Sequence, residues 1–242
     1  MILRDLLQAR GAKARLQRAI EISLELLYPP RCAGCGRVDA DWCEKCQDEL
    51  DHSLLDLHTS QLPPLKAIAA TGVHEGKLQD AVHALKYAGA ISVAAPLAER
   101  LLTALEALQW QVDMIMPVPL HKNRQNERGM NQAEKLAIFV AEALNIPYNA
   151  STLQRWRDTP PQVGLNRQQR QANMRDAFRA SAPISGRVLL IDDVFTTGAT
   201  LQACAHAARE AGATRVYGLT VSAARSPMDK GVMRNGDQHT GS

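Results

Sequence analysis

Short apolar runs alternate along the chain with longer stretches whose apolar residues recur at helical spacing. The runs at 67–73, 112–118, 188–191 and 215–222 have the length of buried strands, and a further short strand is expected at 153–156. The stretches at about 76–87, 92–108, 131–144 and 200–211 repeat apolar residues on one helix face. Strands that alternate with helices predict an α/β fold with a parallel sheet.

The remaining segments predict a division of the chain. Residues 1–30 have helical periodicity and a basic first half. They are interpreted either as an arm that packs on the protein or a partner, or as an arm for a membrane surface or nucleic acid. Residues 31–50 form a cysteine module and 51–64 a linker before the main domain at 65–224. Residues 225–242 are polar without periodicity, which predicts a disordered tail.

Composition narrows the class of protein. The chain has 242 residues, of which 45% are hydrophobic, enough for a sizeable core. The net charge of +3 does not by itself indicate a nucleic-acid binder, although the basic residues outnumber the acidic ones two to one between His121 and Arg179. No apolar run reaches the length of a membrane span. Paired thiols with a fifth cysteine, Cys204, predict a reducing cytoplasm.

The segment RVLLIDDVFTTGAT, at 187–200, contains the strongest candidate chemistry. A buried strand ends in two carboxylates, Asp192 and Asp193, which suit sugar hydroxyls or Mg²⁺. The start of a helix then offers backbone N–H groups to a phosphate. These features predict a ribose 5-phosphate site; the alternative is a buried strand followed by a helix with a threonine cap. The phosphate loop would consist of Thr196, Thr197, Gly198, Ala199 and Thr200.

Two basic segments could complete an anion site. One follows the PVPL end of the strand at 112–118 and contains Leu120, His121, Lys122, Arg124 and Arg128. It is either a pyrophosphate site at the carboxyl edge of the sheet or a solvated basic loop. The other, at 153–178, is polar and rich in arginine, which is typical of a lid or of a disordered surface loop. Its candidate phosphate contacts are Arg155, Arg157, Arg167 and Arg170.

Two CxxC pairs define the cysteine module. Cys32 and Cys35 form the first pair, and Cys43 and Cys46 form the second. Two such pairs can place four thiolates at the corners of a tetrahedron, which favours structural Zn²⁺. A redox pair and an iron–sulfur cluster are the alternatives. A module this small has too little core to fold without its metal.

The motifs from Cys32 to about Ala224 resemble those of the ComF family. The resemblance rests on the CxxC pairs, LKYAG at 85–89, PVPL at 117–120, ERGMNQ at 127–132, RWRDT at 155–159 with Gln162, RQAN at 170–173 with Ala177 and Phe178, and the 187–200 segment. The family commonly has Phe where Met130 stands. The last motif is similar to the phosphoribosyl pyrophosphate (PRPP) signature of type I phosphoribosyltransferases.

This resemblance implies a type I phosphoribosyltransferase-like parallel sheet flanked by helices, with a small N-terminal zinc-ribbon module built on the four cysteines. It also implies that Asp192 and Asp193 hold the ribose hydroxyls beside Mg²⁺, that 196–200 bind the 5-phosphate, and that 120–124 meet pyrophosphate. The flexible loop would begin at Arg155 and Arg157. The family is linked to competence, DNA uptake and the use of external DNA on the cytoplasmic side, which makes DNA-uptake proteins candidate partners.

Two functions remain open from the sequence. In the first, the protein is a phosphoribosyltransferase in which Asp192, Asp193, Arg155 and Arg157 act in catalysis, and charge stabilisation dominates. No segment identifies the acceptor. In the second, a non-catalytic module handles single-stranded DNA and uses the PRPP site for binding or sensing. Trp42 and Trp156 would then stack bases or simply pack.

Overall fold

The fold is described from a computed structural model. It describes residues 29–38, 40–52, 55–88, 91–121, 123, 125, 129–157 and 177–224. The expected tail, all but the last two residues of the expected arm, and most of the expected lid lie outside these residues. The same holds for Lys122, Arg124, Arg128, Arg167 and Arg170.

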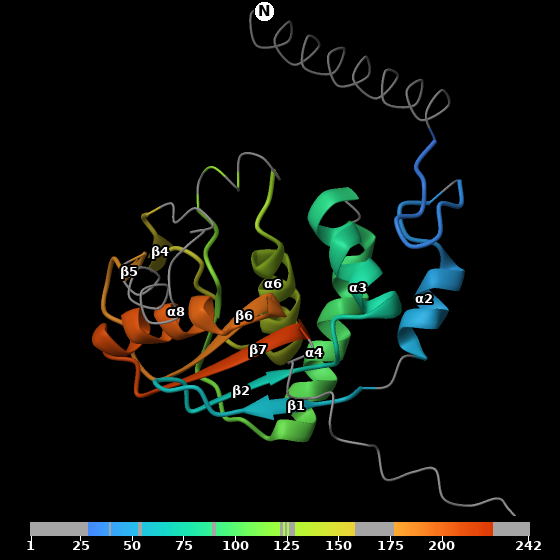
Figure 1. The fold of residues 1–242 in the computed structure, drawn as a ribbon. Coiled ribbons are helices and arrows are strands. Elements are labelled where there is room, and N and C mark those ends of the chain that lie inside the picture. The colour runs from blue at the N-terminus through green and yellow to red at the C-terminus, as the bar shows by residue number, and fades with distance from the viewer. Residues whose placement is uncertain are drawn as a thin grey trace, which may run out of the picture.

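A five-stranded sheet forms the centre of the molecule (Figure 1). Its strands in spatial order are β1 (His58–Ser60), β2 (Ala67–Ala70), β7 (Arg215–Ala223), β6 (Arg187–Phe195) and β3 (Met114–Pro117). All neighbours are parallel except β1, which pairs antiparallel with β2. A separate antiparallel pair consists of β4 (Leu153–Arg155) and β5 (Phe178–Ala180). The predicted α/β class with a mostly parallel sheet is confirmed.

Helices cover both faces of this sheet. On one face, α4 (Ala94–Leu108) and α6 (Gln132–Leu144) pack on the strands, next to α3 (Gly76–His83). On the other, α8 (Ala199–Glu210) lies beside β4 and β5 (Figure 1). A π-helical turn, η1 (Ala84–Ala88), follows α3, and a short 3₁₀ helix, η2 (Ile91–Val93), precedes α4. The helix α2 (Glu44–Asp51) belongs to the cysteine module. None of these helices is long and apolar enough to cross a membrane.

The inner strand β6 contributes side chains to the hydrophobic cores on both faces of the sheet, because its side chains alternate between the faces. Leu189 and Ile191 point to the face covered by α4 and α6, whereas Val188 and Leu190 point to the face covered by α8. All four side chains are fully buried. Each such burial stabilises the fold by about 2 kcal/mol, so the sheet is held from both sides.

Two differences from the expected boundaries matter for the site. The strand expected at 188–191 continues through both acids to Phe195, because β7 pairs with it along its length, from Arg187 opposite Arg215 to Phe195 opposite Ala223. Strand β1 lies within the segment expected as a linker at 51–64. Its sequence, HTS, has no apolar alternation that could have predicted an edge strand.

Candidate functional site

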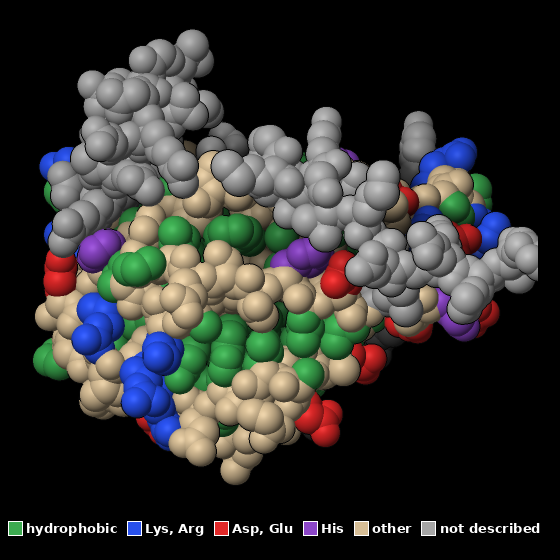
Figure 2. All heavy atoms as spheres, turned by 60° about the horizontal axis from the view of Figure 1, so that its bottom comes forward, with side chains coloured by type: hydrophobic (Ala, Val, Ile, Leu, Met, Phe, Trp, Pro, Cys, Tyr) green, Lys and Arg blue, Asp and Glu red, His purple; other side chains and the backbone are tan. Residues whose placement is uncertain are grey.

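The candidate site lies where the parallel strands β2, β7 and β6 reach their carboxyl ends. Open α/β sheets bind ligands at this edge. The opposite edge is basic, since Lys66, Arg215 and Arg187 stand at the starts of β2, β7 and β6. Figure 2 shows a cluster of Lys and Arg side chains at the left of the face that it presents and others at its far right.

Asp192 and Asp193 diverge, because consecutive side chains of a strand point to opposite faces. Asp192 lies on the same face of β6 as Leu190 and therefore faces α8 and Arg155. Burial, and then the charge of Asp193, raise the pKa of Asp192 to about 8, against the opposing effects of the Asp193 N–H, which donates to Asp192 Oδ1 at 2.9 Å, and of Lys86 and Arg155. Asp193 faces α3 instead. The pair therefore offers one acceptor to each side of the sheet edge.

Lys86, a residue of the LKYAG motif, lies beside Asp193. Its ammonium nitrogen lies 2.8 Å from Asp193 Oδ1, and both side chains are largely buried. Beside them, His74 Nδ1 lies 2.8 Å from Ser222 Oγ at the ends of β2 and β7. Burial, and then the charge of Lys86, lower the pKa of His74. No sequence pattern signals this neighbourhood, since its members are far apart along the chain.

The expected phosphate loop joins β6 to α8. Gly198 is the residue before α8 and has a φ of 77°, a left-handed conformation that glycine adopts at no steric cost. A Cβ at this position would collide with Leu62 Cδ2 and lie 2.7 Å from Phe195 Cε2. Thr196 and Thr197 lie beside this turn. The Ala199 N–H, the first of α8, donates to Thr197 Oγ1 at 3.4 Å, and Gly198 offers no capping side chain. The N-terminus of a helix is a place that attracts an anion.

The PVPL segment reaches the same edge of the sheet. The backbone N–H of Val118 donates to the carbonyl of Ile191 at 2.9 Å, one residue before Asp192. Leu120 and His121 follow and are half-buried. His121 Nδ1 accepts a hydrogen bond from the Asn123 N–H at 3.3 Å. The cations that would complete the pyrophosphate site lie outside the described residues.

The two arginines at the start of the expected lid occupy different surroundings. Arg155 is opposite Phe178 in the β4–β5 pair, and its guanidinium carbon lies 5.4 Å from the ring centre. Its charge acts on Asp192. Arg157 instead lies over the exposed ring of Trp156, at 4.4 Å, which Arg179 also approaches, at 5.2 Å. Of these two arginines, Arg155 is the one whose charge is seen to act on Asp192.

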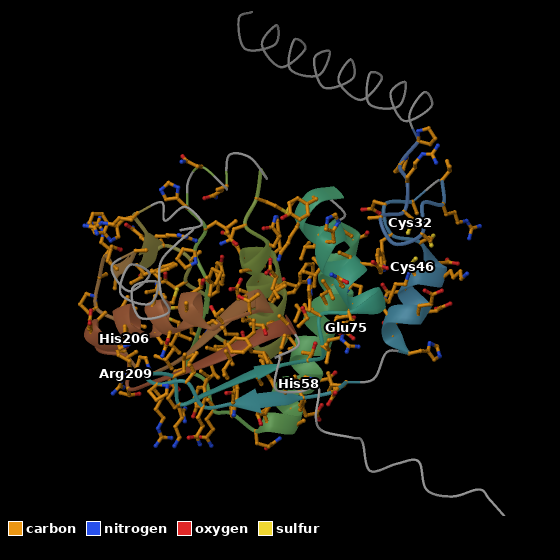
Figure 3. All side chains as sticks on the ribbon, viewed as in Figure 1. Cys32, Cys46, His58, Glu75, His206 and Arg209 are labelled. Carbon is orange, nitrogen blue, oxygen red and sulfur yellow. The ribbon has the colours of Figure 1, made fainter. Side chains whose placement is uncertain are left out.

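The four cysteines of the module converge. Their sulfurs all lie within 4.8 Å of one another, with 3.7 Å between Cys32 and Cys46 and 3.6 Å between Cys35 and Cys43. Figure 3 labels Cys32 and Cys46 next to each other at the start of this module. Four sulfurs around one tetrahedral zinc ion at about 2.3 Å would lie about 3.8 Å apart. The cluster therefore has the dimensions of a tetrathiolate metal site.

The cluster shifts the pKa values of two of its thiols in opposite directions. Burial, and then contacts with the other three cysteines, raise the pKa of Cys46 to about 12. Desolvation opposes ionisation of Cys32, but the N–H groups of Cys43, Gly34 and Cys35 outweigh it and lower the pKa of that thiol to about 6. Trp42 is buried beside the cluster and donates from Nε1 to Gln47 Oε1 at 3.1 Å. Trp42 therefore packs against the protein core. The fifth cysteine, Cys204, is buried on α8 among apolar neighbours.

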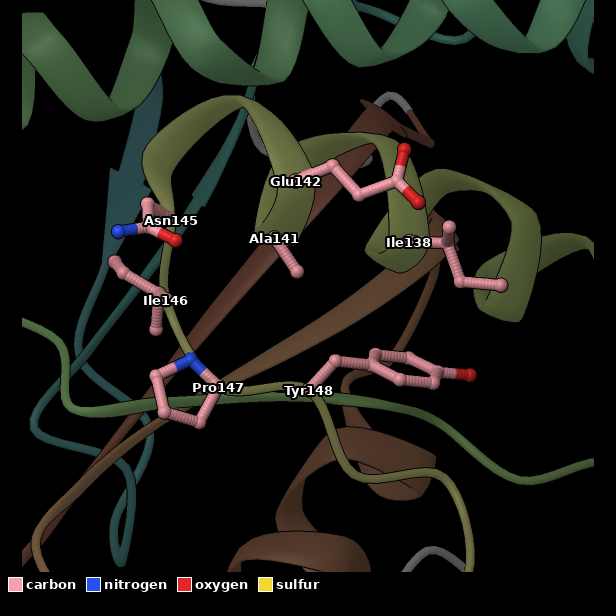
Figure 4. A pocket seen from close by; sticks show the side chains of 7 residues that line it. All are labelled: Ile138, Ala141, Glu142, Asn145, Ile146, Pro147 and Tyr148. Atoms are coloured by element: carbon pink, nitrogen blue, oxygen red, sulfur yellow. The ribbon is translucent and has the colours of Figure 1, made fainter.

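A hollow of about 410 Å³ lies at the end of α6, away from these sites (Figure 4). Its lining includes Ile138, Ile146 and Pro147 with Tyr148. The Tyr148 hydroxyl donates to Glu134 Oε1 at 3.1 Å. Burial, and then the charge of Glu134, raise the pKa of Tyr148. None of the predicted site residues lines this hollow.

Several known proteins are similar to this chain. DNA utilization protein YhgH of Salmonella typhi is 30% identical over 193 residues, which cover 76% of this chain and 85% of the relative. The protein of the same name from Escherichia coli K12 is 29% identical over 195 residues, with the same coverage. Competence protein F of Haemophilus influenzae is 36% identical over 113 residues, 44% of this chain and 49% of the relative. No protein-family model matches the sequence.

Similar solved structures include phosphoribosyltransferases. An adenine phosphoribosyltransferase aligns with a TM-score of 0.38 and 16% identity, over 77% of this chain and 92% of that one. A glutamine PRPP amidotransferase from B. subtilis aligns with a TM-score of 0.36 and 24% identity, over 52% and 26%.

Fold and site together define an α/β protein with an acidic pair at the carboxyl edge of a mostly parallel sheet and a four-cysteine cluster before it. Within this class, the chain belongs to the family of DNA utilization protein YhgH and Competence protein F. The ComF resemblance of its motifs is confirmed.

Proposed function

We propose that the carboxyl edge of the sheet binds PRPP together with Mg²⁺. The observation that carries the proposal is that Asp192 and Asp193, near the end of β6, are followed a few residues later by Gly198, the residue before α8. Carboxylates accept hydrogen bonds from ribose hydroxyls and attract Mg²⁺, whereas the N-terminus of a helix attracts a phosphate. A phosphorylated ribose satisfies both within one short segment.

The assignment of roles follows from the positions of the residues. The 196–200 loop would bind the 5-phosphate, with Thr196 and Thr197 as hydroxyl donors. Asp192 and Asp193 fit the ribose hydroxyls and the Mg²⁺ ion. Arg155 would stabilise charge that develops on pyrophosphate, because its guanidinium already acts on Asp192. The remaining predicted contacts, Leu120, His121, Lys122, Arg124, Arg128 and Arg157, complete the proposed PRPP site.

Calorimetry of PRPP with Mg²⁺ tests the proposal. The double variant Asp192→Asn, Asp193→Asn should lose binding by at least about a hundredfold, roughly the loss of two charge-assisted contacts. A matched control is Glu99→Gln, Glu106→Gln, which also removes two carboxylates but from the exposed side of α4. The control should bind as the wild type does. Absence of PRPP binding by the wild type, or equal binding by the double aspartate variant, would show that the proposal is wrong.

A second measurement separates an enzyme from a binding protein. Pyrophosphate release from PRPP is followed across a panel of nucleobases, amines and DNA ends. Release with one acceptor, lost in the double aspartate variant, defines a phosphoribosyltransferase. Binding without release defines a sensor.

The names of the relatives support a role in DNA utilisation or competence, and we propose that this chain shares it. The exposed Trp156 ring, approached by Arg157 and Arg179, favours a contact with single-stranded DNA as a second function. Trp156→Ala should weaken DNA binding, and the affinity should fall with salt. A binding constant that does not change with salt would remove this second function.

The cysteine cluster is proposed to hold structural Zn²⁺, since its four sulfurs have the spacing of a tetrathiolate site. All five cysteines are free thiols in the structure. We propose the cytoplasm as the location, because a reducing compartment keeps such thiols available to a metal.

A further inference from the structure

Lys86 lies in the π-helical turn η1, which follows α3 without a break. Turns of this kind widen a helix locally and frequently occur at functional sites. The LKYAG motif therefore has an unusual backbone at the point where Lys86 leaves the helix. The proposed PRPP site gives this lysine no role.

The Lys86 ammonium forms an ion pair with Asp193. The two atoms are 2.8 Å apart, and the side chains are only 18% and 13% exposed. A carboxylate in such a place needs a positive partner, because an unpaired charge withdrawn from water is strongly destabilising. Lys86 therefore neutralises the acid that faces α3 when no ligand is present.

The described neighbours of this pair do not supply Asp193 with a second positive partner in place of Lys86. His74 is hydrogen-bonded to Ser222 Oγ, and burial and then Lys86 lower its pKa, which favours the neutral imidazole. Asp192 points to the other face, toward Arg155. Among the described residues, Lys86 is thus the positive group that forms an ion pair with Asp193.

An ammonium group and a divalent cation compete for the same carboxylate oxygens. While Lys86 is paired with Oδ1, Asp193 cannot offer both of its carboxylate oxygens to Mg²⁺. A ligand that contains several phosphates offers the displaced lysine new oxygen partners nearby. Exchange of partners would keep every charge paired in both the free and the bound protein.

We propose that Lys86 is an exchangeable counter-ion: it pairs with Asp193 in the free protein and transfers to a phosphate oxygen of PRPP when Asp193 takes a divalent cation. This inference rests on the proposed function and adds a residue to that site. It predicts opposite effects of one substitution. Loss of the ammonium group should strengthen binding of the metal alone and weaken binding of PRPP with the metal.

The test measures both affinities in the full chain. Free Mn²⁺ is followed by electron paramagnetic resonance without PRPP, and PRPP with Mg²⁺ by calorimetry. In Lys86→Gln, Mn²⁺ should bind at least about threefold more tightly and PRPP at least about tenfold more weakly, the scale of one charge-assisted contact. Lys86→Arg, which keeps the charge, should stay close to the wild type in both. Lys66→Gln removes an equal charge at the opposite edge of the sheet and should change neither affinity.

The outcomes separate this inference from the proposed function. If the wild type binds PRPP but Lys86→Gln binds PRPP and Mn²⁺ as the wild type does, the inference is overturned and the function stands. If the wild type binds no PRPP, the proposed function fails together with the transfer of Lys86 to PRPP. The Mn²⁺ affinities of the wild type and Lys86→Gln then decide whether Lys86 and a cation compete for Asp193, and equal affinities overturn that part as well. Thermal unfolding of Lys86→Gln beside the wild type shows that the variant is folded under the conditions of the binding measurements.

Discussion

The ammonium group of Lys77, on α3, lies 3.5 Å from the sulfur of Cys46 in the cysteine module. It also contacts the carbonyl of Gly34 at 3.4 Å and Glu49 at 3.0 Å. A zinc ion with four thiolates carries a double negative charge, and a cation that donates to one sulfur partly offsets it. This lysine therefore connects the proposed metal site to the helix that leads to Lys86.

Lys77→Met should weaken zinc retention by about tenfold, which is typical for loss of a group that contacts a metal ligand. A competition titration with a chromophoric chelator measures the change. Lys45→Met is the matched control, because Lys45 is an exposed lysine of the same module that pairs with Glu49 at 3.9 Å. Equal zinc affinities of the two variants would contradict the prediction.

Gly198→Ala should disturb the proposed phosphate loop. The new Cβ meets Leu62 and Phe195. In addition, the left-handed backbone of Gly198 costs about 1 kcal/mol for most residues other than glycine. Gly36→Ala is a control with nearly the same strain, since Gly36 has a φ of 76° and open space around it. Both variants should unfold at lower temperature, but only Gly198→Ala should lose PRPP affinity, by about tenfold or more. A normal affinity would place the phosphate elsewhere.

Binding of the ligand with Mg²⁺ should release a proton at pH 7. The pKa of Asp192 is raised to about 8 by burial and by the charge of Asp193, so its carboxyl group is largely protonated at that pH. A cation requires the ionised form, and binding should strengthen by up to roughly tenfold per pH unit until the pH exceeds the pKa of this carboxyl group.

Calorimetry in two buffers with different enthalpies of ionisation detects this proton. The apparent binding enthalpy of the wild type should differ between the buffers at pH 7 and agree at about pH 9.5, where the carboxyl group is already ionised. Asp192→Asn removes the titrating group, so any binding that remains should release no proton. A wild-type enthalpy that is independent of the buffer at pH 7 would refute the assignment.

Much of the fold could be predicted from the sequence, because the patterns that indicate it lie within short segments of the chain. The apolar run before Asp192, the threonine loop and the CxxC spacing each depend on adjacent residues, and the strand, the helix start and the sulfur cluster are all present in the described structure. The register of β6 with β7 is not local. Only that pairing carries the strand past Asp193 and sends the two acids to opposite faces.

The residues that could not be predicted from the sequence make contacts through long side chains to residues far away along the chain. Lys86 is far from Asp193 along the chain, and the π-helical turn that carries it follows a helix whose apolar pattern predicts an ordinary α-helix. Arg100 is a second case: its guanidinium donates to the carbonyls of Leu50 and Thr71, at 3.3 Å each, and so links the cysteine module to the end of β2. No spacing rule connects these positions.

The last prediction concerns stability at the basic edge of the sheet. Asp113 and Arg187 join the starts of β3 and β6 through side-chain contacts of 2.6 Å and 2.9 Å, and the Arg187 N–H adds a third at 2.7 Å. The hydrogen bonds from Arg187 lower the pKa of Asp113 to about 2, from an ordinary value of 3.8. Because the folded state holds the ionised form, the contribution to stability is complete above about pH 4 and disappears as the pH falls toward about 2.

Thermal unfolding of the wild type should therefore shift to lower temperature between about pH 4 and pH 2 more steeply than that of Asp113→Asn, which lacks the titrating group. At pH 7 the variant should unfold at lower temperature than the wild type. Asp48→Asn, at an exposed position on α2, should reproduce the wild-type curve. PRPP affinity should be the same in all three proteins, because the pair lies at the edge of the sheet opposite Asp192. Parallel unfolding curves for wild type and Asp113→Asn across this range would contradict the stabilising role of the ion pair.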